Sequence, residues 1–250
     1  MPAIPLYIMN HVAVCASATQ HGFLIVRGVL SPEEVALVIE ALEQNVAIEG
    51  HEMHIDDALG GKSKQVLWNK PGNGTLGNLT RSERICGTAQ ALLGGEVRHY
   101  FNKRLLKKAG DPGVWQWHQD YSYALSLLME VNLRRTDRFI TAGRYWYKDY
   151  FLFPHMQTIW VALDKADREN GCLKVMRRSC QMGRIDHFVV GGQQVADAQR
   201  VEQLENHPLG GAVYCEMEPG DAVSARLKNL LSYIHAPVAV ARNTCCVRYA

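Results

Sequence analysis

The chain has 250 residues, of which 47% are hydrophobic and 21% are charged. This length suits one domain, and the apolar content is enough to fill a sizeable core. The formal net charge of +2 argues against nucleic acid or an anionic membrane as the main partner, because those partners select clustered Lys and Arg. We therefore expect one globular domain over residues 1–250.

The seven cysteines include no CxxC pair, which argues against a disulfide framework and favours a reducing compartment. The first thirty residues lack the pattern of a signal peptide, and no apolar run reaches membrane-spanning length. The C-terminus is not a peroxisomal signal either. The cytoplasm is the default expectation, with no membrane span.

The first half of the chain predicts helices around one buried strand, residues 23–26. Ser31, Pro32 and Glu34 have the pattern of an N-cap, a first-turn proline and a capping-box glutamate, so a helix should run from there to about Gln44. Residues 50–78 show no sustained periodicity, which predicts a long surface loop or an active-site flap. A second capping box at Thr80 to Glu83 predicts a helix that ends at Gly94-Gly95.

From residue 96 onward the pattern changes to short aromatic and β-branched segments separated by turns. Two of these turns are Glu169-Asn170-Gly171 and Glu218-Pro219-Gly220. Several short strands with such turns favour a sandwich or a jelly roll. Residues 193–205 are the exception, because Val195, Ala198 and Val201 lie on one helical stripe and predict a helical insertion.

Residues 114–120 predict a strand that carries a histidine and a carboxylate two positions apart. Side chains alternate along a strand, so His118 and Asp120 share one face and can bind one metal side by side. A third ligand from a facing strand would complete a 2-His-1-carboxylate triad. The pair lies between Trp115 and Trp117 on one side and Tyr121 on the other, an aromatic setting that excludes water.

Several segments resemble, in order, the conserved blocks of the phytanoyl-CoA dioxygenase family. They are Trp115-Gln-Trp-His-Gln-Asp-Tyr-Ser-Tyr123, Leu152-Phe153-Pro154, the segment 159–164 and Glu169-Asn170-Gly171-Cys172-Leu173. The resemblance implies a mainly β fold with flanking helices, a double-stranded β-helix or cupin-like jelly roll. It also implies Fe(II), O2 and 2-oxoglutarate, with release of succinate and CO2 as an aliphatic carbon of a small organic or lipid-like substrate is hydroxylated.

The resemblance also implies residues for the co-substrate. Trp160 matches a family tryptophan near the keto acid, although a core tryptophan is an equal reading of this apolar strand. Lys107 or Lys108 lies where a family lysine contributes to the same pocket, although lysine side chains are more often solvated. Arg242 has the spacing of the arginine that binds the distal carboxylate, with Arg248 as the alternative.

Three features depart from the family pattern. About twenty residues, roughly 124–144, interrupt the chain after the HxD block and represent either a lid or a retained non-native segment. A family glycine is replaced by Arg178, which lacks the backbone freedom of glycine. The C-terminal segment from about residue 224 is atypical, because Asn229-Leu230-Leu231 is followed by Ser232 where the family has its third iron ligand.

His235 is the candidate third ligand, because it is the one histidine after residue 220. It lies three residues late, which moves a strand side chain by about 10 Å and reverses its face, so it requires a bulge or a shifted register. Two alternatives therefore stay open. One is an inactive relative or misassembled gene product that keeps the fold without the third ligand, and the other is a cupin-like metalloprotein of another class, such as an isomerase.

Overall fold

The computed structural model describes residues 18, 20–45, 52–56, 62–68, 70–107, 114–120, 156–183, 185–190, 193–226, 229–233 and 242–249. The strands are β1 (Phe23–Val26), β2 (Glu52–Asp56), β3 (Lys62–Trp68), β4 (His99–Lys107), β5 (Trp115–Gln119), β6 (Gln157–Ala162), β7 (Leu173–Met176), β8 (His187–Val190), β9 (Gln193–Ala196), β10 (Ala212–Cys215), β11 (Ala222–Arg226), β12 (Leu230–Tyr233) and β13 (Arg242–Tyr249). The helices are α2 (Pro32–Glu43), α3 (Thr75–Arg81), the π-helical η1 (Glu83–Gly87), α4 (Thr88–Leu93), the 3-10 turn η3 (Ser179–Gln181) and α6 (Ala198–Glu205).

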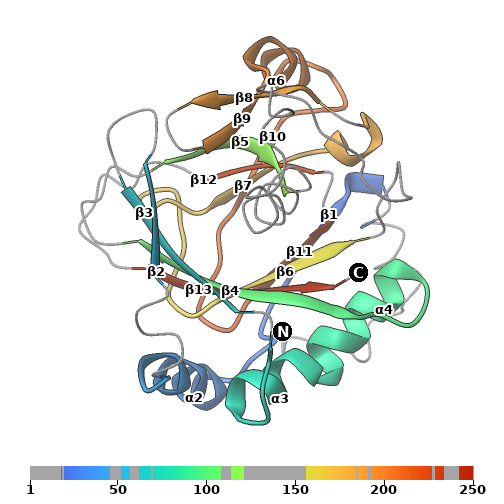
Figure 1. Cartoon of the computed structure of the whole chain (residues 1–250). Coiled ribbons are helices and arrows are strands. Elements are labelled where there is room, and N and C mark those ends of the chain that lie inside the picture. Colours follow the sequence, from blue (N-terminus) through green and yellow to red (C-terminus); the bar gives the residue numbers. More distant parts are fainter. Residues whose placement is uncertain are drawn as a thin grey trace, which may run out of the picture.

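Two antiparallel sheets face each other and form the body of the molecule (Figure 1). The larger has seven strands in the order β1-β11-β6-β13-β4-β3-β2, and the smaller has four in the order β10-β7-β12-β5. Apart from β2, β3 and β4, which follow one another in the chain, neighbouring strands in each sheet are distant in sequence, as in a double-stranded β-helix, where the chain alternates between sheets. The predicted mainly β jelly roll with flanking helices is confirmed.

The space between the sheets is filled by apolar side chains from both. The larger sheet contributes Leu105, Trp160 and Val223, and the smaller sheet contributes Trp115 and Leu231. These residues have low exposure because each points away from solvent toward the facing sheet. The interior is therefore a packed apolar layer, and the strand with the HxD pair borders it.

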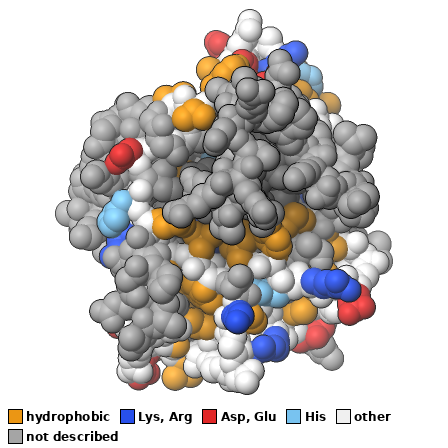
Figure 2. All heavy atoms as spheres, viewed as in Figure 1, with side chains coloured by type: hydrophobic (Ala, Val, Ile, Leu, Met, Phe, Trp, Pro, Cys, Tyr) orange, Lys and Arg blue, Asp and Glu red, His pale blue; other side chains and the backbone are white. Residues whose placement is uncertain are grey.

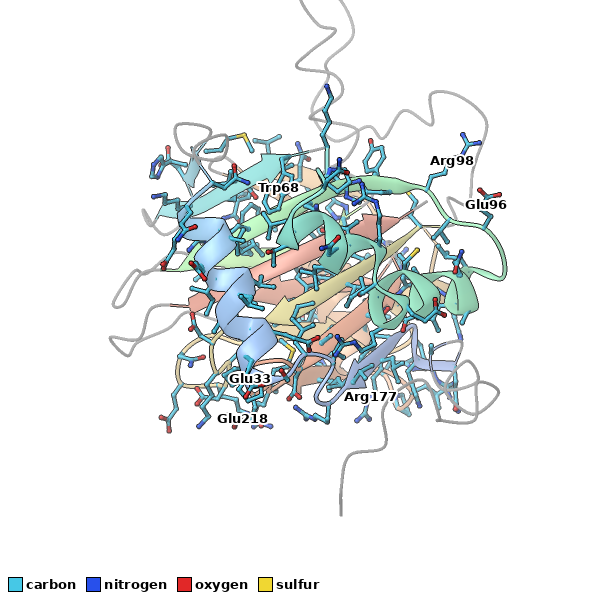
Figure 3. All side chains as sticks on the ribbon, turned by 90° about the horizontal axis from the view of Figure 1, so that it is seen from below. Glu33, Trp68, Glu96, Arg98, Arg177 and Glu218 are labelled. Atoms are coloured by element: carbon cyan, nitrogen blue, oxygen red, sulfur yellow. The ribbon has the colours of Figure 1, made fainter. Side chains whose placement is uncertain are left out.

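Helices α2, α3 and α4 cover the outer face of the seven-stranded sheet, as Figure 3 shows from below. In β6 the alternation of side chains is complete, since Ile159 and Val161 pack under the helices whereas Trp160 and Ala162 face the interior. Both sides of β6 are therefore buried. This double burial explains why its last four residues are all apolar.

The helix predicted from Ser31 is confirmed as α2. The Ser31 hydroxyl accepts a hydrogen bond from the Glu34 backbone N–H, and the Glu34 carboxylate accepts one from the Ser31 N–H. Val35, Val38 and Leu42 form its buried stripe against the sheet. The strand predicted at residues 23–26 is likewise confirmed as β1, which pairs with β11.

The prediction of a loop over residues 50–78 is wrong. Strands β2 and β3 lie in this stretch and extend the seven-stranded sheet beyond β4, and α3 begins at Thr75. Gln65 and Val66 are almost fully buried there. Pairing with β4 and the burial of Gln65 and Val66 stabilise β3 although its first four residues are all polar, so the tertiary setting overrides the local pattern.

Two helix boundaries were also predicted wrongly. Thr80 is an interior residue of α3, where its hydroxyl donates to the Leu76 carbonyl, and the next helical segment starts only after Ser82. The end predicted for the second helix, at Gly94-Gly95, is correct, because Gly94 is the C-cap of α4 and has a φ of 80°. The predicted helix over residues 193–205 begins instead as strand β9, and α6 starts behind Asp197, whose side chain accepts from the Arg200 N–H.

Strands β8 and β9 pair with each other and, together with α6, pack on the outer side of the smaller sheet (Figure 1). The contact is a separate apolar cluster in which Trp117 of β5 meets Ile185 and Ala196, with Val201 and Leu204 from α6. This layer lies directly behind the strand with the HxD pair.

The face of the molecule drawn in Figure 2 carries no large patch of one charge among the described side chains. Figure 2 shows Lys, Arg, Asp and Glu side chains in small separate groups on the face viewed there. Among the described residues, no helix is both long and apolar enough to cross a bilayer.

Candidate metal centre

The predicted strand at residues 114–120 is confirmed as β5, and it contains a bulge. Across the ladder to β12, His118 pairs with Leu231, whereas Trp115 pairs with Tyr233. Three steps on β5 therefore oppose two steps on β12, so β5 carries one extra residue. The bulge turns both Trp115 and His118 toward the interior, where their ring centroids are 5.8 Å apart.

His118 and Asp120 come together as predicted. The Nε2 atom of His118 lies 3.4 Å from Oδ1 of Asp120, and both side chains are buried. Two donor atoms bonded to one metal at about 2.1 Å and at right angles are about 3 Å apart, close to this separation. The pair thus has the spacing of two neighbouring ligands.

The ring of His118 is oriented by the backbone of its own strand. Its Nδ1 lies 2.6 Å from the carbonyl oxygen of Gln116, which can only accept, so Nδ1 carries the hydrogen. The Nε2 atom then faces Asp120 as the metal-binding nitrogen. A backbone carbonyl that fixes the histidine tautomer in this way is usual among metal ligands. The residues present therefore fit a divalent metal at two positions.

Only one of the two tryptophans beside the HxD pair belongs to the interior. Trp115 is 6% exposed and packs in the interior cluster, whereas Trp117 packs against the outer layer of β8, β9 and α6. The Lys103 ammonium lies 4.9 Å from the Trp115 ring centroid. A cation thus lies over the aromatic wall beside His118.

The strand that faces His118 carries an apolar side chain at the facing position. Leu231 pairs with both His118 and Val175 and is 1% exposed in the interior cluster. The next residue, Ser232, donates its hydroxyl to the Trp115 carbonyl at 2.8 Å. Neither side chain supplies an iron ligand, which agrees with the departure from the family pattern read from the sequence.

Within the described residues, no three His, Cys, Asp or Glu side chains group as a metal site. His235 lies outside those residues, as does the predicted insertion at about 124–144. The described part of β12 runs from Leu231 opposite His118 toward Tyr233 opposite Trp115, and so leads away from the HxD pair.

The predicted co-substrate residues lie on neighbouring strands of the larger sheet. Trp160 is 4% exposed and belongs to the interior cluster, a position that a core tryptophan and a tryptophan beside the keto acid would both have. The backbone register pairs Arg242 with Lys107 at the ends of β13 and β4, and it pairs Cys246 with Trp160. Arg242 and Lys107 are thus adjacent along the sheet, and Trp160 lies on the next strand.

A network around Gln119 is the part of the site that the sequence did not single out. The backbone N–H of Gln119, between the two candidate ligands, donates to Nε2 of His187 at 2.9 Å. The Gln119 side chain donates to the Gly183 carbonyl and accepts from the Ile185 N–H. The only sequence signal was the histidine itself, and His187 is a fully buried residue at the start of β8.

A family model described as phytanoyl-CoA dioxygenase (PhyH) matches residues 18–225. The chain belongs to the phytanoyl-CoA dioxygenase family. The family resemblance read from the sequence is confirmed. The matched region ends before β12, so the strand that faces His118 lies beyond it.

Among curated proteins, the chain is similar to an L-proline trans-4-hydroxylase from Streptomyces griseoviridis. The two are 27% identical over 116 residues, which is 46% of this chain and 35% of the hydroxylase. The match therefore spans only about a third of that enzyme's length.

Solved structures share the fold at low identity. The carbocyclase SnoK from nogalamycin biosynthesis has a TM-score of 0.72 at 17% identity, over 100% of this chain and 87% of SnoK. The epimerase SnoN, in complex with Fe3+, alpha ketoglutarate and nogalamycin RO, has a TM-score of 0.69 at 18% identity, over 96% and 82% of the two chains. EctD from S. alaskensis, with 2-oxoglutarate and 5-hydroxyectoine, has a TM-score of 0.67 at 16% identity, over 94% and 74%. The predicted Fe(II) and 2-oxoglutarate agree with the groups bound in these neighbours.

Proposed function

We propose that this protein is an Fe(II)- and 2-oxoglutarate-dependent dioxygenase that hydroxylates an aliphatic carbon of a small organic or lipid-like molecule. The observation that carries the proposal is the buried pair His118 and Asp120, whose donor atoms are 3.4 Å apart. Family membership supports the same chemistry. We assign this activity to residues 1–250 as one catalytic domain.

His118 and Asp120 are proposed as two protein ligands of the iron, with His235 as the third. When bound, iron(II) with 2-oxoglutarate and O2 supplies the oxidising power for hydroxylation, and succinate and CO2 are the by-products. The protein's own part is to fix the His118 ring through the Gln116 carbonyl and to keep water away with Trp115. Thr158 adds a long contact of 3.5 Å from its hydroxyl to the Asp120 carboxylate.

The keto acid is proposed to bind beside this pair, along β4, β6 and β13. Arg242 would bind the distal carboxylate in the bidentate manner that suits a guanidinium and a planar anion. Lys107, which pairs with Arg242 in the register, would add positive charge, and Lys103 adds a second ammonium over Trp115. Trp160 provides one apolar wall of the interior near these residues.

Anaerobic addition of Fe(II) and 2-oxoglutarate tests the proposal. We expect a visible metal-to-ligand charge-transfer band from the chelated keto acid, followed by succinate on exposure to air. His118→Ala should abolish both signals, whereas His54→Ala, which removes an exposed histidine on β2, should change neither. A folded protein with neither the band nor succinate would contradict the proposal and would support an inactive relative.

His235→Ala addresses the third ligand separately. We expect this variant to lose iron affinity together with the band, because a third imidazole greatly strengthens a site with two protein ligands. If the variant keeps the band and forms succinate as the wild type does, His235 is not a ligand and the oxygenase proposal stands without it.

A further inference from the structure

Strand β5 lies at the edge of the four-stranded sheet, so one row of its backbone groups has no neighbouring strand. An unprotected edge exposes N–H and C=O groups and allows the strand to move. Here side chains from β8 and β9 take the place of that strand. The Gln193 side chain accepts from the Gln116 N–H at 3.1 Å and donates to the Val114 carbonyl at 2.7 Å.

The same protection continues to the point where the candidate iron ligands lie. The backbone N–H of Gln119 donates to Nε2 of His187 at 2.9 Å, and His187 Nδ1 lies 2.7 Å from the Ile185 carbonyl. A carbonyl can only accept and a backbone N–H can only donate, so His187 must carry its hydrogen on Nδ1 and a lone pair on Nε2. Both ring nitrogens are therefore committed, and His187 is 0% exposed.

Gln119 also holds the segment before β8 with its own side chain. Its amide nitrogen donates to the Gly183 carbonyl at 2.9 Å, and its amide oxygen accepts from the Ile185 N–H at 3.0 Å. Gln119, the residue between His118 and Asp120, is therefore held from outside by three hydrogen bonds, one from its backbone N–H and two through its side-chain amide. A displacement of Gln119 would change the spacing of the two donor atoms, because both side chains belong to its chain neighbours.

We propose that His187 is a positioning residue, which acts through the Gln119 backbone to hold His118 and Asp120 at metal-binding spacing. The role rests on the proposed function, since it gives the buried hydrogen bond a consequence for iron. Partners that orient metal ligands from outside typically change metal affinity by about 10- to 100-fold when removed. Such partners contact the ligand side chains themselves, whereas His187 accepts a hydrogen bond from the backbone of Gln119, between the two candidate ligands.

Two substitutions separate the atoms of the His187 ring. His187→Gln places an amide near the position of Nε2, so its oxygen can still accept from the Gln119 N–H. His187→Asn places its amide near Nδ1 and can still donate to the Ile185 carbonyl, but it leaves the Gln119 N–H without its acceptor. Val201→Ala is the control for general destabilisation, because it creates a cavity in the same outer cluster without removing any hydrogen bond to Gln119.

The first measurement is amide hydrogen exchange at Gln119 in the metal-free protein. We expect exchange about tenfold faster in His187→Asn, the effect of one lost buried hydrogen bond, and near wild type in His187→Gln. The second measurement is titration with Co(II) alone, followed by its visible absorption. His187→Asn should bind Co(II) about 10- to 100-fold more weakly, whereas His187→Gln and Val201→Ala should stay within about threefold of wild type.

Unchanged exchange in His187→Asn would overturn the hydrogen-bond assignment. Faster exchange with unchanged Co(II) affinity, or equal weakening in Val201→Ala, would overturn the positioning role and leave His187 as a structural residue. Failure of the wild type itself to bind Co(II) would overturn the proposed metal centre and the positioning role with it, while the exchange comparison would still establish whether His187 holds Gln119.

Discussion

Arg178 adopts a backbone conformation that suits glycine. Its φ is 59° and its ψ is 4°, and it is the one described non-glycine residue with positive φ. The left-handed region costs an L-residue with a Cβ roughly 1–2 kcal/mol. The family resemblance implies a glycine at this position, and the turn at Arg178 has the geometry that a glycine would serve.

Replacement of Arg178 by Gly should therefore stabilise the protein. The relieved strain of about 1–2 kcal/mol exceeds the added entropy of glycine in the unfolded chain, about 0.4–1 kcal/mol, so we expect a net gain of about 0.5–1 kcal/mol. The midpoint of denaturant unfolding measures it. Arg177→Gly is the matched control, because Arg177 is exposed, labelled in Figure 3, and has no positive φ. The control should lose stability, and a loss of equal size in both variants would show that Arg178 is not strained.

At this scale the sequence predicted the HxD pair but not the side chains around it. Alternation along a strand was sufficient to place His118 and Asp120 together. The bulge in β5 lies before His118, so it does not disturb the alternation between the two residues. The sequence did not predict that Leu231 faces His118, because that pairing depends on a register between strands more than a hundred residues apart. His187 was missed for the same reason, since its partner is a backbone N–H that no side-chain pattern reveals.

The N-terminus of helix α2 is linked to the π-helical turn η1 through the side chain of Glu34. Glu34 completes the capping box at Ser31 and also forms a bidentate ion pair with Arg84, whose Nη1 donates to the Val29 carbonyl as well. The hydrogen bond from Arg84 holds the pKa of Glu34 below its ordinary value of 4.5, with help from the Ser31 N–H. Glu34 and Arg84 together thus link the start of α2, the turn η1 and the backbone carbonyl of Val29.

The stability that Glu34 contributes should depend on pH in one direction. Because its pKa is lower in the folded state, the unfolded chain binds the proton first as pH falls, so the contribution is complete above about pH 4.5 and disappears below it. Glu34→Gln should cost about 0.5–1 kcal/mol at pH 7, a modest value because 38% of this side chain is exposed. Urea unfolding of both proteins at pH 7 and at pH 3 measures the difference. A difference that persists at pH 3 would contradict the ionic origin of the effect.

Elements with strong local signals were predicted well, and elements that depend on partners were not. The cap of α2 and the glycine that ends α4 are local, so the sequence was sufficient. Strand β3 has a polar first half and is held by β4, and β9 was read as helix because four residues carry too little periodicity. For both strands the deciding interaction comes from a neighbouring strand.

The whole molecule places the candidate ligands in the smaller sheet and the proposed co-substrate residues in the larger one. Asp120 already contacts Thr158 of β6 across the interior, and Trp115 packs with Trp160 in the same cluster. A keto acid bound to the metal and to Arg242 would therefore connect β5 with β13. Such a connection exists only in the folded protein, because the unfolded chain does not hold these residues together.

Metal and keto acid should consequently raise the thermal stability in a concentration-dependent way, with the effect of the keto acid depending on the metal. A ligand present at about 100 times its Kd stabilises the folded state by about 2.7 kcal/mol, which for a chain of 250 residues corresponds to roughly 5–10 °C. We expect Co(II) to raise the Tm of the wild type, and 2-oxoglutarate to raise it further only when Co(II) is present. His118→Ala should remove both increments, whereas Arg242→Ala should keep the first and lose the second. Thermal unfolding under anaerobic conditions, with magnesium in place of Co(II) as the reference, makes the comparison. A keto acid increment of the same size in His118→Ala would place 2-oxoglutarate away from the metal pair and would contradict the proposed arrangement of the site.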